Sequence, residues 1–180
     1  HVIEGAKQVW IYPFPKEGLG TVLHDSTRLI GRIVAQSKKT DLALVQVTGL
    51  SPNIKAVSLG TLTDIVPGED VFAIGHPHAT YTWSVTDGIV NQIRPDFCWN
   101  YGEVGFDCAE TDHKATLIQN NAEISGGNSG GPLFNEQGKM IGINSWSETG
   151  AQNLNMAIAV NHVKELIENR EKPGTKKEVS

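Results

Sequence analysis

Ser125-Gly126-Gly127-Asn128-Ser129-Gly130-Gly131-Pro132-Leu133 is the stretch of this sequence that says most about its fold. Glycines stand on both sides of Ser129, and glycine adopts positive φ angles easily and adds no side-chain bulk. Such a loop can bring a serine close to a substrate and can aim backbone N–H groups at the charge that develops on a tetrahedral intermediate. The stretch therefore predicts a nucleophilic serine beside an oxyanion hole, with an ordinary glycine-rich turn as the alternative.

Two arrangements of serine hydrolases compete for this motif. Gly127-x-Ser129-x-Gly131 formally matches the nucleophile elbow of α/β-hydrolases, which needs a helix directly after the serine. Glycines and Pro132 follow Ser129 and disfavour that helix. No aspartate follows Ser129, so the order Ser, Asp, His of that fold fails, although Glu148 and His162 remain formal candidates. The order His, Asp, Ser is favoured, and a lipase or esterase is the disfavoured interpretation.

The rest of the chain is a series of short apolar segments that end at glycine, proline or polar residues. Strand-length segments at this spacing indicate an all-β barrel or sandwich. They cover residues 9–12, 31–35, 41–47, 71–75, 88–93, 116–119 and 140–146. Residues 161–170 differ, because Val163, Leu166 and Ile167 follow the i, i+3, i+4 pattern of an amphipathic helix. The sequence thus predicts an all-β fold with one C-terminal helix.

Composition excludes several classes of function. The chain has 180 residues, 39% of them hydrophobic, and 15 Lys+Arg against 20 Asp+Glu give a net charge of −5. This is enough chain to bury a core, and it lacks the basic surface expected of a nucleic-acid binder. No apolar run approaches the ~20 residues of a membrane span. Three histidines (His76, His78 and His113) and two cysteines show no paired ligand spacing, so neither a metal nor another cofactor is predicted.

Several segments together resemble HtrA/DegP-type trypsin-like serine proteases. Residues 127–133, followed by 138–144, look like the active-site region of that family. Thr40-Asp41-Leu42-Ala43-Leu44-Val45 resembles its catalytic-aspartate strand. Further matching stretches occur in order along the chain, at 68–77, 85–90, 118–125 and 155–164. The resemblance implies two antiparallel β-barrels of the chymotrypsin type and a closing helix.

The resemblance also implies a catalytic triad. His1-Val2-Ile3 matches the family's histidine string, whereas His24 stands in a context that matches nothing in the motif. Carried over by position, His1 is the general base, Asp41 orients it and Ser129 is the nucleophile. The backbone N–H groups of Gly127 and Ser129 form the oxyanion hole. The implied reaction is hydrolysis of peptide bonds in protein substrates through an acyl-enzyme.

The match begins at the catalytic histidine itself, so we expect the first barrel to be incomplete and this chain to be an inactive fragment of a protease. The expected division is a remainder of the first barrel at 1–62, the second barrel with its helix at 63–170, and a solvated tail at 171–180. A terminal histidine is hard to hold in place. A peptide-binding module on the same fold, without catalysis, is therefore the alternative function.

The resemblance places the substrate pocket as well. One wall is expected from Glu123, Ile124, Ser125 and Gly126, and the other from Ser145, Trp146 and Ser147, whose strand pairs with the substrate backbone. Ile124 favours an apolar side chain at the cleaved position. Glu123 favours lysine or arginine if it faces the pocket floor and has no effect if it faces solvent, which is the usual place of a lone glutamate.

Two further expectations depend on the resemblance. It implies a location outside the cytoplasm, where disulfides persist, and Cys98 and Cys108 are then favoured to form one across their short loop. Such a bridge contributes about 2–3 kcal/mol in the chain-entropy model. The resemblance leaves a homo-oligomer open. Protein or peptide substrates are the expected partners.

Overall fold

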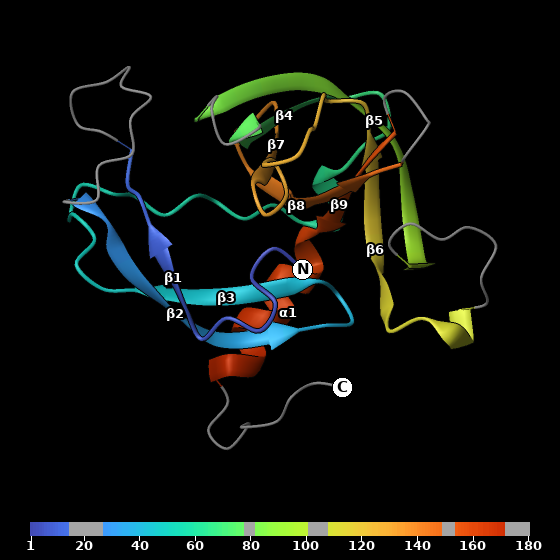
Figure 1. Ribbon diagram of the computed structural model, residues 1–180. Helices are drawn as coiled ribbons and strands as arrows, with labels where there is room; N and C mark the ends of the chain where they lie inside the picture. The colour runs from blue at the N-terminus through green and yellow to red at the C-terminus, as the bar shows by residue number, and fades with distance from the viewer. Residues whose placement is uncertain (15–26, 78–81, 101–107, 149–153, 172–180) are drawn as a thin grey trace.

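The computed structural model describes residues 1–14, 27–77, 82–100, 108–148 and 154–171. These form two β structures, one α-helix and two short 3₁₀ helices, Leu62–Asp64 and Cys108–Glu110 (Figure 1). His24 and His78 lie outside the described residues. In these residues no helix is both long and apolar enough to cross a membrane.

The first β structure is a three-stranded antiparallel sheet in the order β1-β2-β3. Its strands are β1 (Gln8–Ile11), β2 (Leu29–Ser37) and β3 (Leu42–Val47). Residues 38–41 connect β2 to β3 in a tight turn, in which the Asp41 N–H donates to the Lys38 carbonyl at 3.2 Å. The turn therefore places Asp41 directly in front of the apolar strand β3.

The second β structure is a closed barrel of six antiparallel strands in the order β4-β5-β6-β9-β8-β7. The strands are β4 (Asp70–Gly75), β5 (Ser84–Trp99), β6 (His113–Asn120), β7 (Pro132–Asn135), β8 (Met140–Ser147) and β9 (Asn155–Ala159). Val71, Ile118, Leu133 and Ile141 are fully buried inside it. The glycine-rich loop connects β6 to β7, so a barrel strand holds it at each end.

Strand β5 is longer than the sequence predicted. The strand was expected to stop before Pro95, but it continues to Trp99. The pairing between β5 and β6 skips from Arg94 to Phe97 at a bulge, and Asp96 there has φ of 50°. A bulge is one of the few places where a strand tolerates proline, because no ladder hydrogen bond depends on its missing N–H. The β5–β6 hairpin consequently extends well beyond the barrel (Figure 1).

Helix α1 (Val160–Glu171) follows β9 directly and holds the two β structures together. It packs against β2 and β3 of the sheet and against β8 and β9 of the barrel. Val163 and Leu166 pack on a core cluster that includes Leu42 from the sheet and Leu117 from the barrel. His162 accepts a hydrogen bond from the Thr116 N–H at 2.8 Å. These contacts fix the sheet that carries Asp41 against the barrel that carries Ser129.

The prediction of an all-β chymotrypsin-type fold with a short C-terminal helix is confirmed. The second barrel is closed, and the first is present as the three-stranded sheet. The division at residue 62 stays a prediction. So does the tail at 171–180, although α1 includes Glu171 and residues 172–180 lie outside the described part of the chain.

Asp64, in the segment between the two β structures, forms an ion pair with Lys139, which directly precedes β8. This ion pair gives a prediction about stability in acid. A hydrogen bond from Lys139 (2.9 Å), helped by bonds from Thr61, lowers the pKa of Asp64 from 3.8 to about 2. A lowered pKa stabilises the fold above the unfolded value, and this stabilisation is lost as the pH falls from about 4 towards 2. We expect Asp64→Asn to flatten the fall in melting temperature over that range. Asp87→Asn, at an exposed position, is the control. The same fall in melting temperature with pH in the Asp64 variant and in the wild type contradicts the prediction.

Candidate active site

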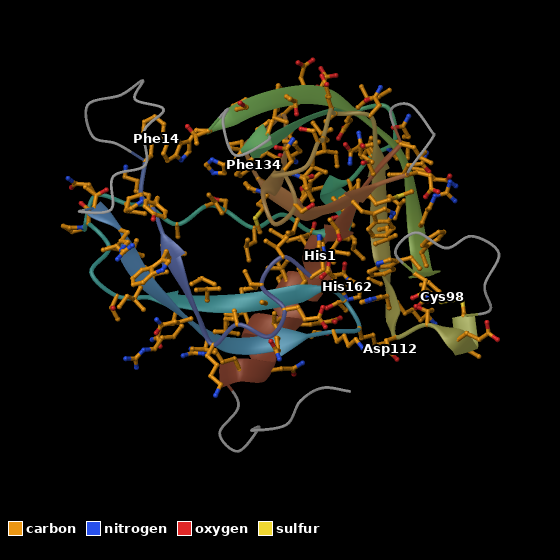
Figure 2. All side chains as sticks on the ribbon, in the orientation of Figure 1. His1, Phe14, Cys98, Asp112, Phe134 and His162 are labelled. Carbon is orange, nitrogen blue, oxygen red and sulfur yellow. A yellow bond between two sulfur atoms is a disulfide. The ribbon has the colours of Figure 1, made fainter. Side chains whose placement is uncertain are left out.

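The carboxylate of Asp41 connects the sheet, the barrel and the N-terminus. It accepts hydrogen bonds from the ring Nδ1 of His1 at 2.8 Å and from the Ser145 hydroxyl at 2.6 Å, and it pairs with the His1 α-amino group. Its side chain is only 5% exposed. The residue has φ of 53°, a left-handed conformation that aspartate tolerates better than most residues. Figure 2 shows His1 between the three-stranded sheet and the barrel.

Ser129 lies in the loop that precedes β7, and its hydroxyl donates to the Ser145 carbonyl at 2.7 Å. A hydroxyl carries one proton, so the proton that points at this carbonyl cannot be donated to an imidazole at the same time. Rotation about the Cα–Cβ bond redirects it. Ser145 therefore contacts two of the three predicted triad members, the nucleophile through its carbonyl and Asp41 through its hydroxyl.

The loop before Ser129 turns sharply at Gly127, which has φ of 107°. That angle is nearly restricted to glycine. Asn128 N–H donates to the Ser125 carbonyl at 3.0 Å, whereas the N–H groups of Gly127 and Ser129 have no acceptor among the residues that the structure describes. These two N–H groups are therefore available for the oxyanion-hole role that the sequence predicts.

His76 supports this loop, a role that the sequence did not suggest. Its backbone N–H donates to the Gly127 carbonyl at 3.1 Å, and its ring Nδ1 accepts from the Trp83 N–H at 3.2 Å. The rings of His76 and Trp83 meet edge to face at 5.3 Å, and Phe14 packs on Trp83 in the same way at 5.2 Å. An aromatic cluster thus links the end of β1 to the loop. The sequence shows that Gly75-His76-Pro77 ends a strand, but it does not show that His76 contacts Gly127.

The predicted substrate residues lie on two segments. Glu123 is exposed, and its backbone carbonyl accepts from the Thr86 hydroxyl at 2.8 Å. Ile124 and Ser125 are half-buried and Gly126 is exposed. On β8, Ser145 is buried, Trp146 is half-buried and Ser147 is exposed. The exposed Glu123 side chain agrees with the solvent-facing alternative.

The cysteines and the other histidines lie elsewhere. Cys98 and Cys108 form a disulfide at the end of the β5–β6 hairpin. His113 donates from its ring to the Lys38 carbonyl at 2.9 Å, and His162 interacts with Glu165 at 3.2 Å on α1. In the described part of the chain, no three His, Cys, Asp or Glu side chains come together as a metal site.

Ser145 gives a testable prediction, since its hydroxyl is one of the donors that fix Asp41. We expect Ser145→Ala to slow the reaction of Ser129 with a fluorophosphonate by about tenfold, corresponding to one lost hydrogen bond to a charged group. Ser145→Thr keeps the hydroxyl and is expected to stay within about threefold of the wild type. A wild-type rate in the alanine variant contradicts this role of the hydroxyl.

Known proteins with similar sequences are serine proteases. A model of the trypsin-like peptidase domain matches residues 1–143. The Do-like serine protease HtrB of Bacillus subtilis (strain 168) is 31% identical over 172 residues, which are 93% of this chain and 33% of that protein. The Do-like serine protease HtrA of the same organism is 33% identical and is covered over 34% of its length. The chain spans about a third of the length of these relatives.

Solved structures agree with the sequence matches. The HtrA-type protease AlgW, solved with a decapeptide, superposes with a TM-score of 0.73 at 28% sequence identity, over 97% of this chain and 47% of that one. A serine endoprotease from Yersinia pestis superposes with a TM-score of 0.68. At 24% identity, this second likeness concerns the fold alone.

Proposed function

Because the chain belongs to the family of trypsin-like peptidase domains, we propose that its protein is an HtrA-type serine endopeptidase in which His1, Asp41 and Ser129 form the triad. The observation that carries this proposal is the Asp41 carboxylate, which accepts from the His1 ring at 2.8 Å and from Ser145, whose carbonyl holds the Ser129 hydroxyl. Three segments far apart in sequence thus meet around one buried charge.

Each proposed residue has a defined role in peptide hydrolysis. Asp41 holds the proton of the His1 ring on Nδ1, which leaves Nε2 free to act as a base. His1 takes the Ser129 proton as the oxygen attacks the peptide carbonyl, and then gives it to the leaving amine. The N–H groups of Gly127 and Ser129 stabilise the oxyanion. Water then hydrolyses the acyl-enzyme by the same steps.

A fluorophosphonate tests the proposal, since it reacts only with an activated serine. We expect the protein, together with any residues that its reading frame encodes ahead of His1, to be labelled at Ser129. Ser129→Ala is expected to abolish the label, and the exposed Ser58→Ala to retain it. The prediction of an inactive fragment is tested in parallel, because it expects no label on the 180-residue chain alone.

The second candidate function is peptide binding without catalysis. The observation that favours it is the Ser129 proton, which is donated to the Ser145 carbonyl instead of an imidazole. Absence of label in every form of the protein, with measurable binding of an extended peptide, selects this alternative. Label at Ser129 excludes it.

We further propose an apolar preference at the cleaved position, supported by the half-buried Ile124 and the exposed Glu123. Across peptides that differ only in the residue before the cleaved bond, we expect Val or Ala to be cleaved faster than Lys or Arg. Glu123→Ala is expected to leave that ranking unchanged. A preference for Lys or Arg that disappears in Glu123→Ala places the carboxylate in the pocket and overturns the proposal.

A location outside the cytoplasm is the remaining part of the proposal, supported by the Cys98–Cys108 disulfide. Rapid alkylation of intact cells is expected to modify neither cysteine until a reductant is added. Free thiols in the native protein contradict this location. The resemblance leaves a homo-oligomer open, and the molar mass in solution decides it.

A further inference from the structure

We propose that the end of the β5–β6 hairpin is a positioning clamp for Asp41 and that Trp99 is its central residue. The clamp consists of Cys98, Trp99, Cys108 and residues 111–114. None of them belongs to the proposed triad or oxyanion hole. The inference rests on the proposed function insofar as it assigns the orientation of Asp41 a role in catalysis.

The clamp is closed by covalent and polar contacts. The disulfide joins Cys98 to Cys108, and Trp99 pairs with His113 across the strands. The Thr111 hydroxyl donates to the Trp99 carbonyl and accepts from the His113 N–H at 3.1 Å. Figure 2 shows Cys98 and Asp112 at this end of the hairpin, away from the barrel core. These contacts hold the clamp in one conformation, so it can fix the position of the segments that pack against it.

Its first contact is the turn that carries Asp41. The His113 ring donates to the Lys38 carbonyl at 2.9 Å, and the Lys114 N–H donates to the Lys39 carbonyl at 2.8 Å. The Lys38 ammonium pairs with Asp112 at 2.6 Å. These two carbonyls belong to the residues three and two positions before Asp41. The hairpin thus fixes the backbone that holds Asp41 in its left-handed conformation.

Its second contact is the strand on the other side of the carboxylate. Trp99 is 3% exposed and lies between two rings, His113 at 5.2 Å and Trp146 at 4.8 Å, both nearly parallel to it. Trp146 directly follows Ser145, whose hydroxyl donates to Asp41 at 2.6 Å. Trp99 therefore fixes β8 at the point where β8 meets the carboxylate.

The two contacts act on the same carboxylate, one through the turn before Asp41 and the other through β8. The turn sets where the Asp41 backbone lies, and β8 sets where its Ser145 donor lies. Only the correct placement of both keeps the carboxylate in line with the His1 ring. A displacement of about 1 Å in a catalytic group can cost about a hundredfold in rate. The clamp supplies this placement from residues that never reach the reacting atoms.

The test uses three variants and two readouts. Trp99→Leu removes the stack, Trp99→Phe keeps an aromatic ring, and Cys98→Ala/Cys108→Ala removes the disulfide and leaves Trp99 in place. Trp10→Leu is the control, since Trp10 is 48% exposed beneath Arg28 on the first sheet. Amide hydrogen exchange of residues 38–42 and 143–147 reports the clamp whether or not the protein is active. The rate of fluorophosphonate labelling reports its effect on catalysis.

We expect Trp99→Leu to raise exchange in both segments at least tenfold and to slow labelling tenfold to a hundredfold. Trp99→Phe and Trp10→Leu are expected to stay within about threefold of the wild type. If Trp99→Leu does not fold, the double cysteine variant decides, with increased exchange expected in the same two segments. Wild-type exchange and labelling in a folded variant that lacks the stack or the disulfide overturn the clamp. If exchange rises in the variants and no form of the wild-type protein is labelled, with or without residues ahead of His1, the clamp is kept and the proposed function is overturned.

Discussion

Asp41→Asn is expected to lower the rate of fluorophosphonate labelling at Ser129 by about 10⁴-fold, because an amide at this position leaves the triad histidine in the wrong tautomer. The Asp41 carboxylate accepts from the His1 ring and from the Ser145 hydroxyl. Asparagine offers one acceptor oxygen and an NH₂ group that only donates. A ring that faces this NH₂ must carry its proton on Nε2, and it then cannot accept the proton of the nucleophile.

The substitution is well suited to measurement, because asparagine tolerates the left-handed conformation that Asp41 adopts, with φ of 53°. We therefore expect the melting temperature to change far less than the labelling rate. Asp87→Asn, on the exposed side of β5, is the matched control and should label like the wild type. A labelling rate within tenfold of the wild type in Asp41→Asn removes Asp41 from the triad.

Gly131→Ala is expected to lower the free energy of unfolding by about 3 kcal/mol or more. A Cβ at this position lies 2.0 Å from the Ile74 carbonyl oxygen and 3.0 Å from the Asn128 carbonyl oxygen, and both are backbone atoms. Gly131 is itself fixed, because its N–H donates to Asn128 at 3.0 Å and its carbonyl accepts from Asn144 at 2.9 Å. The clash can be relieved only by separating β4 from the loop.

Gly126→Ala is the matched control for stability, since a Cβ at Gly126 meets nothing within 4 Å. Urea denaturation of the two variants gives the comparison directly. The Gly126 variant should differ from the wild type by no more than about 1 kcal/mol. Equal losses in both variants contradict the steric argument and indicate a general effect of glycine replacement in this loop.

The sequence predicted strands and the helix wherever the pattern of apolar residues within the segment was sufficient. The apolar segments at 41–47, 71–75 and 140–146 lie within or beside strands, and the helix expected at 161–170 forms at Val160–Glu171. Pro95 misled the prediction of β5, because whether a proline ends a strand depends on the partner strand. The bulge that accommodates Pro95 is a property of the β5–β6 pair.

The candidate site was less predictable, since its contacts are long-range. Motifs pointed to His1, Asp41 and Ser129 and assigned Ser145 only to substrate binding. The bond from Ser145 to Asp41 spans 104 positions, and the support that His76 gives to Gly127 depends on how β4 ends beside the loop. No periodicity or spacing encodes such contacts. The stack of Trp99 on Trp146 is of the same kind.

The place of α1 has a consequence for the order in which the molecule can fold. The helix is the last described element of the chain, yet it packs against β2 and β3, which are among the first. Small sheets depend on an apolar face or on packing against a helix for their stability in water. During synthesis these contacts of β2 and β3 can therefore form only after residues 160–171 have been made. Long-range contacts of this kind slow folding, so we expect the sheet that carries Asp41 to dock on the barrel late in folding.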